Sequence, residues 1–154
     1  MSKRGFVGFW AASMLFAWLS GCSPAKEQQG QFKYYIQLVR GNDSDKAPSP
    51  EAKPIGPKLS RQLHEIFKWQ SYWEMHREEV TLNPGEKTKV RLSREREVEI
   101  DLTQVGKRRV TAFESGDALS SVARPIGEAM TIIGGDRDPK SVWFIVVRRD
   151  PPPD

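Results

Sequence analysis

The sequence is poor in the residues that most often build metal sites. It has one cysteine, Cys22, and two histidines, His64 and His76. A single cysteine excludes a disulfide within the chain and every zinc motif that is built from cysteine pairs. Two histidines leave a tetrahedral metal site incomplete, and the spacing of the other residues designates no further ligand. We therefore expect no metal ion and no cofactor, and we expect both histidines to be exposed or structural.

Catalytic signatures and charge of one sign are also scarce. The sequence offers no glycine-flanked serine nucleophile, no cysteine–histidine pair and no phosphate-binding loop. Its 24 lysines and arginines are interspersed with 20 aspartates and glutamates. A nucleic-acid-binding protein typically gathers its cations on one face, so we expect no nucleic-acid partner.

Long hydrophobic runs are missing as well. The longest uncharged apolar run, Phe6–Leu19 (FVGFWAASMLFAWL), is shorter than the roughly 20 residues that cross a bilayer. Lys3 and Arg4 precede this run, and a short positive segment before a short apolar one is typical of an export signal. The pattern predicts a signal peptide over residues 1–21. A membrane helix that extends to Cys22 is the alternative.

The end of the apolar run carries a family resemblance. Leu19-Ser20-Gly21-Cys22 resembles the lipobox of bacterial lipoproteins. The resemblance implies that the chain is cut before Cys22 and that this cysteine carries fatty acyl chains such as palmitate, which would anchor the protein stably to a membrane. Similarity to small, uncharacterised lipoproteins of the Gram-negative envelope implies that Ser23 directs the protein to the outer membrane, facing the periplasm. The alternative for Cys22 is an unmodified thiol.

A tether, one domain and a tail follow the predicted cleavage site. Residues 22–31 are small and polar and predict a flexible tether, whereas residues 32–149 show regular hydrophobic periodicity and predict a single β-rich domain. Residues 150–154 form a proline-rich tail. The proline-rich segment Gly41–Pro57 predicts a long loop, which is the best place for a partner contact if it is not a plain surface excursion.

One helix is predicted among many strands. Apolar residues recur at helical spacing over Lys58–Phe67, after a proline suited to the first turn. Alternation predicts strands at Phe32–Arg40 and from Trp69 onward, with a phase shift that indicates a bulge or a break near Arg77–Glu79. The aromatic residues of the second strand are interpreted as core packing or, alternatively, as a stacking platform for sugars or peptides. These residues are Trp69, Tyr72 and Trp73.

Charge patterning predicts a hairpin after the turn at Asn83–Gly85. Basic residues alternate with apolar ones up to Arg91, and acidic residues alternate with apolar ones from Glu97. Pairing Val90 with Val98 places each base opposite an acid, so the charges predict the register as well as the hairpin.

The carboxy-terminal half predicts further short strands. The run Lys107–Arg109 is interpreted as a solvated strand end, with an anionic-lipid or phosphate contact as the alternative. Val142–Val147 is apolar on both faces, which is typical of a central strand covered on both sides. The preceding segment, Gly134–Pro139, predicts a hairpin connection. Asp136 and Asp138 within it do not complete a calcium loop, because no glutamate follows at the required spacing.

The predicted fold is mainly β: an antiparallel β-sandwich or curved sheet of about seven to eight strands with one short packed helix. The function expected is that of a non-catalytic, membrane-anchored lipoprotein that serves as an accessory or binding module for an envelope protein partner in an assembly, secretion or cell-wall system. The alternative is a small periplasmic hydrolase or carbohydrate-binding domain that uses His64 or His76 with a nearby acid.

Overall fold

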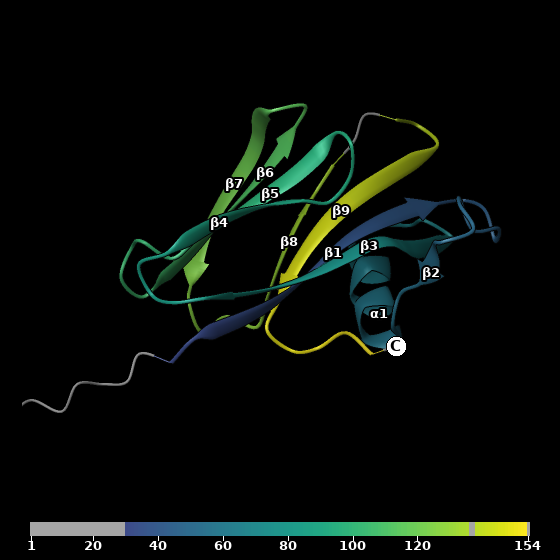
Figure 1. Cartoon of the computed structure of the whole chain (residues 1–154). Helices are drawn as coiled ribbons and strands as arrows, with labels where there is room; N and C mark the ends of the chain where they lie inside the picture. The colour runs from purple at the N-terminus through teal and green to yellow at the C-terminus, as the bar shows by residue number, and fades with distance from the viewer. Residues whose placement is uncertain (1–29, 136–137, 154) are drawn as a thin grey trace, which may run out of the picture.

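The computed structural model describes residues 30–135 and 138–153, and within them the chain forms nine strands and one helix (Figure 1). The predicted signal peptide and Cys22 lie outside the described residues. The elements are β1 (Phe32–Asn42), β2 (Lys53–Pro54), α1 (Pro57–Ile66), β3 (Ser71–Leu82), β4 (Lys87–Arg91), β5 (Arg96–Asp101), β6 (Lys107–Glu114), β7 (Asp117–Pro125), β8 (Met130–Gly134) and β9 (Ser141–Arg148).

The strands form two antiparallel sheets that pack face to face. The larger sheet, sheet A, has the order β2-β3-β1-β9-β8, and the smaller one, sheet B, has the order β4-β5-β6-β7. This arrangement confirms the predicted β-sandwich with one short helix. The strand that the prediction lacked, β2, consists of two residues within the predicted loop Gly41–Pro57.

The main core lies between the two sheets. Alternation along β1 turns Tyr34, Ile36 and Leu38 toward sheet B, where they pack against apolar side chains of the other strands. Those buried partners are Leu82, Leu92, Val98, Ile100, Leu102, Val110, Ala112, Ile133, Trp143, Ile145 and Val147.

Helix α1 covers the opposite face of sheet A and creates a second apolar layer (Figure 1). Pro57 begins the helix, and Leu59 and Leu63 are its buried residues. They pack with Phe144 and other residues of this face. Strand β9 therefore has a core on each side and is buried along its whole length, which confirms the prediction of a central, doubly covered strand.

The β4–β5 hairpin has the predicted register. Val90 lies opposite Val98, and Arg91 lies opposite Glu97. The Arg91 guanidinium donates to the Glu97 carboxylate at 3.0 Å, and the Lys89 ammonium lies 3.7 Å from the same carboxylate. Strand pairing and cross-strand charge thus agree in this hairpin.

The bulge in β3 lies at a different position from the one predicted. Leu38 pairs with His76 and Val39 pairs with Glu74, so Met75 is the extra residue. The prediction near Arg77–Glu79 was wrong because no residue from His76 to Glu79 is apolar, so the sequence does not mark where between Met75 and Val80 the hydrophobic phase shifts. Met75 packs against the main core, and the bulge aims His76 toward the end of the sandwich.

The interpretation of Lys107–Arg109 as a solvated strand end was wrong at its middle residue. The side chain of Arg108 is fully buried between the sheets, whereas Lys107 and Arg109 are exposed. Its guanidinium donates to the Thr131 hydroxyl at 2.7 Å and to the Glu128 carbonyl at 3.2 Å, and it lies over the Tyr34 ring. Arg108 therefore links sheet B to the β8 side of sheet A.

Two further contacts complete the fold. A side chain at Gly134 would collide with the Phe144 ring. The close approach of this ring therefore accounts for a glycine at position 134 without a phosphate-binding role. Pro153 packs against Gly56 at the start of α1, so the proline-rich tail lies along the helix. Among the described residues, the structure holds no helix with the length and apolar character that crossing a bilayer requires.

Candidate functional site

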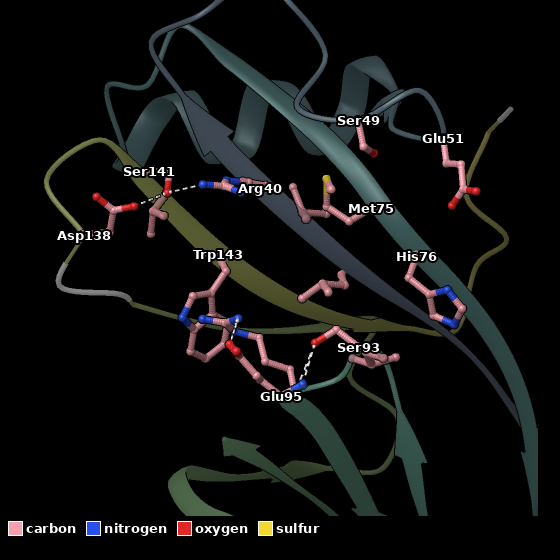
Figure 2. Close-up of a pocket in the computed structure, with 15 residues that line it drawn as sticks. Arg40, Ser49, Glu51, Met75, His76, Ser93, Glu95, Asp138, Ser141 and Trp143 are labelled. Carbon is pink, nitrogen blue, oxygen red and sulfur yellow. Dashed lines mark hydrogen bonds and ion pairs between the residues drawn. The ribbon is translucent and has the colours of Figure 1, made fainter. Parts of the chain in front are cut away.

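A cleft of about 460 Å³ opens between the two sheets at one end of the sandwich (Figure 2). It lies where β1 ends, next to the turn between β4 and β5 and the connection between β8 and β9. Its walls combine apolar residues of both sheets with charged residues of the loops. The lining residues are Leu38, Val39, Arg40, Ser49, Glu51, Met75, His76, Leu92, Ser93, Glu95, Arg96, Asp138, Ser141, Val142 and Trp143.

A chain of hydrogen bonds fixes one side of the cleft. The Arg40 guanidinium donates to the Ser141 hydroxyl at 2.9 Å, and this hydroxyl donates to the Asp138 carboxylate at 2.8 Å (Figure 2). The backbone N–H of Lys140 also donates to Asp138, at 2.9 Å. Both hydrogen bonds lower the pKa of Asp138, and the one from the Lys140 backbone N–H has the larger effect. Asp138 therefore stays ionised at neutral pH and offers a fixed negative charge.

The β4–β5 turn forms the opposite wall. The Ser93 hydroxyl accepts hydrogen bonds from the backbone N–H groups of Glu95 and Arg96, which shapes this turn. The Arg96 guanidinium lies 4.7 Å from the centre of the Trp143 ring and pairs with Glu114 at 3.2 Å. The Trp143 face is thus covered by a cation of the other sheet, and the turn is held against sheet A.

The proline-rich loop after β1 contributes Ser49 and Glu51 to the rim. Its start is fixed by the Asp43 carboxylate, which accepts a hydrogen bond from the backbone N–H of Gln70 at 3.3 Å. The Ser44 hydroxyl accepts from the backbone N–H of Lys46 in the same way, at 3.1 Å. The sequence singled out this loop as a place for partner contacts, and the structure places part of it at the cleft.

The structure separates the two histidines. His76 lines the cleft, and its Nε2 lies 2.9 Å from a carboxylate oxygen of Glu78. His64 lies on α1, beyond the other face of sheet A, where its Nδ1 is 2.7 Å from the Ser60 carbonyl and its ring meets the Tyr72 ring edge-on. The two residues therefore cannot serve one site.

A histidine–carboxylate pair alone does not make a hydrolase. Glu78 is not among the residues that line the cleft, and both side chains are more than 40% exposed. Among the described residues, no hydrogen bond joins His76 to a serine of the cleft, and Ser141 and Ser93 have other partners. The pair consequently has no nucleophile in position to activate.

The aromatic residues of β3, and Trp69 just before this strand, are packing residues. Tyr72 is buried against α1 and Phe144, and its hydroxyl donates to the Phe67 carbonyl at 3.1 Å. Trp69 packs against the same layer, and Trp73 is half-buried opposite Pro54. These contacts favour the core interpretation over a stacking platform.

The cleft is suited to binding a polar partner. Its lining includes the guanidinium groups of Arg40 and Arg96, carboxylates such as that of Asp138, and apolar side chains such as those of Leu38 and Met75. No group of three or more histidine, aspartate and glutamate side chains within the described residues has a metal-binding arrangement. Such a surface offers both charged and apolar contacts to a bound group.

The chain matches no protein-family model, no curated protein and no solved structure.

Sequence reasoning identified few residues of the cleft. Arg40 lies in β1, Glu95 in the β4–β5 turn, and Ser141 and Trp143 in β9. They share no sequence motif, so only the fold brings these three segments together. Two signals pointed to the cleft: the long loop after β1, of which Ser49 and Glu51 line the cleft, and His76, which the hydrolase alternative named.

Proposed function

We propose that this protein is a lipid-anchored, non-catalytic binding module of the Gram-negative envelope, held at the outer membrane through Cys22, and that its cleft contacts an envelope protein partner. The lipobox-like segment Leu19–Cys22 supports the anchor. The mixed charge and apolar lining of the cleft support a peptide segment of that partner as the bound group.

The observation that carries this proposal is the position of the cleft relative to the tether. Strand β1 begins at Phe32, where the predicted tether ends (Figure 1). Its residues Leu38 to Arg40 line the cleft, and Arg40 is eight residues beyond Phe32. Eight strand residues span about 26 Å. A domain anchored through its N-terminus would therefore hold the cleft at the end far from the bilayer, where a partner has access.

The anchor is tested by replacing Cys22 with serine in the full-length protein and analysing the product by mass spectrometry. We expect the unchanged protein to begin at an acylated Cys22, and we expect Cys22→Ser to keep residues 1–21 and to lack acyl chains. Normal cleavage and membrane retention of Cys22→Ser would contradict the lipidation of this cysteine.

Binding at the cleft is tested with a photo-crosslinking amino acid in the full-length protein. At Glu95, on the cleft wall, we expect a discrete adduct with one envelope protein. At Arg109, an exposed residue on the outer face of sheet B, we expect none. Equal adducts at both positions would show random collision and would contradict the assignment of the cleft.

The hydrolase alternative rests on the His76–Glu78 pair at the edge of the cleft. In the binding module, His76→Ala should leave the Glu95 adduct unchanged, because the carboxylates and guanidinium groups of the cleft remain in place. Loss of a hydrolytic activity in a folded His76→Ala protein would support the alternative instead.

A further inference from the structure

Strand β7 forms an open edge of sheet B. It pairs with β6 on one side, and among the described strands none pairs with its other side. Eight of its nine residues are exposed, and only Val122 is half-buried. Leu119 is 48% exposed, although it is a large apolar residue. Unpaired N–H and C=O groups along such an edge are ready to bind another strand.

The other described edges carry features that prevent such pairing. Strand β4 presents Lys87, Lys89 and Arg91, and β2 consists of two residues, one of which is Pro54. Strand β8 is only five residues long. In contrast, β7 has no charge from Ala118 to Ala123 and no proline before its last residue. It is the edge that the sequence leaves unprotected.

We propose that β7 pairs antiparallel with β7 of a second copy of this chain, around a two-fold axis at Ser121. A two-fold axis perpendicular to a sheet places one residue opposite its own copy, and its neighbours then pair symmetrically. With Ser121 at the axis, Ser120 lies opposite Val122. The two copies of sheet B would form one continuous sheet.

The bulge in β7 brings the terminal charges together in this pairing. Ala118 pairs with Phe113 and Ser120 with Ala112, so Leu119 is the extra residue. With Leu119 skipped, Ala118 meets Ala123 of the second copy, and Asp117 meets Arg124. Without the bulge, Asp117 would meet Pro125. The bulge therefore creates an opposite-charge pair at each end of the interface.

The two charged residues also point to the same face. Asp117 pairs with Glu114 of β6 and Arg124 pairs with Arg108, and these two β6 residues are six positions apart, on one face of their strand. Arg124 has one exposed contact, to Glu128 at 3.8 Å, which leaves its guanidinium accessible. Charge complementarity and small central side chains thus favour a second copy over an unrelated strand.

A single-cysteine assay tests this pairing without relying on the anchor or the cleft. In full-length Cys22→Ser protein, Ser121→Cys would be the only thiol. Residues that face each other across an antiparallel pair have Cα atoms about 4.5–5.5 Å apart, which suits a disulfide. We expect mild oxidation to give a covalent dimer.

Thr111→Cys in the same background is the matched control. The Thr111 hydroxyl lies 2.9 Å from that of Ser121, so it points to the same face from the next strand inward. Each strand adds about 4.8 Å, which places two copies of residue 111 beyond disulfide reach. A dimer from Thr111→Cys as fast as that from Ser121→Cys, or no dimer from either, would overturn the pairing.

Charge reversal provides the second measurement. With Ser121→Cys present, Arg124→Asp should slow dimer formation about tenfold, because two like-charge contacts replace two opposite ones. Adding Asp117→Arg should restore the original rate, since the pair is then reversed in both copies. Equal rates in all three proteins would show that these residues do not meet and would overturn the register.

Discussion

At the scale of single residues, the guanidinium of Arg108 ties the two sheets together from inside the core. Its hydrogen-bond partners are the Thr131 hydroxyl and the Glu128 carbonyl, which are neutral. Among the described residues, no carboxylate forms an ion pair with it. Burying a cation without a counter-charge is costly, so the hydrogen bonds and the Tyr34 ring must offset most of that cost.

Two substitutions at Arg108 separate its charge from its volume. Arg108→Met keeps most of the packing and removes the buried charge, so it should lower the free energy of unfolding by only about 1 kcal/mol. Arg108→Ala also leaves a cavity and should lower it by about 3 kcal/mol. Urea denaturation of the purified proteins measures both values. A methionine variant less stable than the alanine variant would contradict this assignment.

The burial of Arg108 was predictable in part. Arg108, Val110 and Ala112 alternate along β6 and face the core together, but the basic neighbours of Arg108 made the segment resemble a solvated strand end. The cleft residues were not predictable in this way. Arg40 and Asp138 share a site only because β1 ends beside the start of β9, which no local pattern encodes.

At the scale of elements, local patterns determined most of the fold. The charges of β4 and β5 predicted their register residue by residue, because a slip by one position would place basic residues opposite apolar ones and turn apolar residues to water. The helical spacing predicted α1 to within one residue at each end. The pairing of sheets and the choice of edges depend on contacts between distant segments, and those were not predicted.

Two residues of helix α1 test which of its faces packs against sheet A. Leu63 is fully buried against sheet A, whereas Ile66 on the same helix is 69% exposed. Leu63→Ala should lower the free energy of unfolding by about 3 kcal/mol, and Ile66→Ala should change it by less than about 0.5 kcal/mol. Chemical denaturation compares the two variants. Similar losses at both positions would contradict the described orientation of the helix.

At the scale of the whole molecule, the pKa shifts of several carboxyl and basic groups set the pH range of stability. Hydrogen bonds lower the pKa of Glu86, Asp101 and Asp138. The hydrogen bond to Glu79 raises the pKa of Lys33, and burial raises that of Tyr34. A carboxyl group whose pKa is lowered in the fold stabilises the protein at pH values above the ordinary carboxyl pKa. A lysine or tyrosine whose pKa is raised in the fold stabilises it at pH values below the ordinary pKa of that side chain.

The fold should therefore be most stable across neutral pH and should lose stability in both directions. As the pH falls below about 4, the unfolded chain takes up protons that the folded carboxylates still exclude, and stability declines. As the pH rises above about 10, the unfolded chain releases protons that Lys33 and Tyr34 still hold in the fold, and stability declines again. Denaturation of the protein in detergent between pH 3 and pH 11 measures this profile.

Asp101→Asn tests the acidic side of the profile. It removes the carboxylate charge to which the Thr103 hydroxyl donates a hydrogen bond at 2.6 Å, so it should make the acidic decline in stability shallower and leave the alkaline decline unchanged. An acidic decline as steep as that of the unchanged protein would show that the charge of Asp101 does not contribute to the pH dependence of this fold.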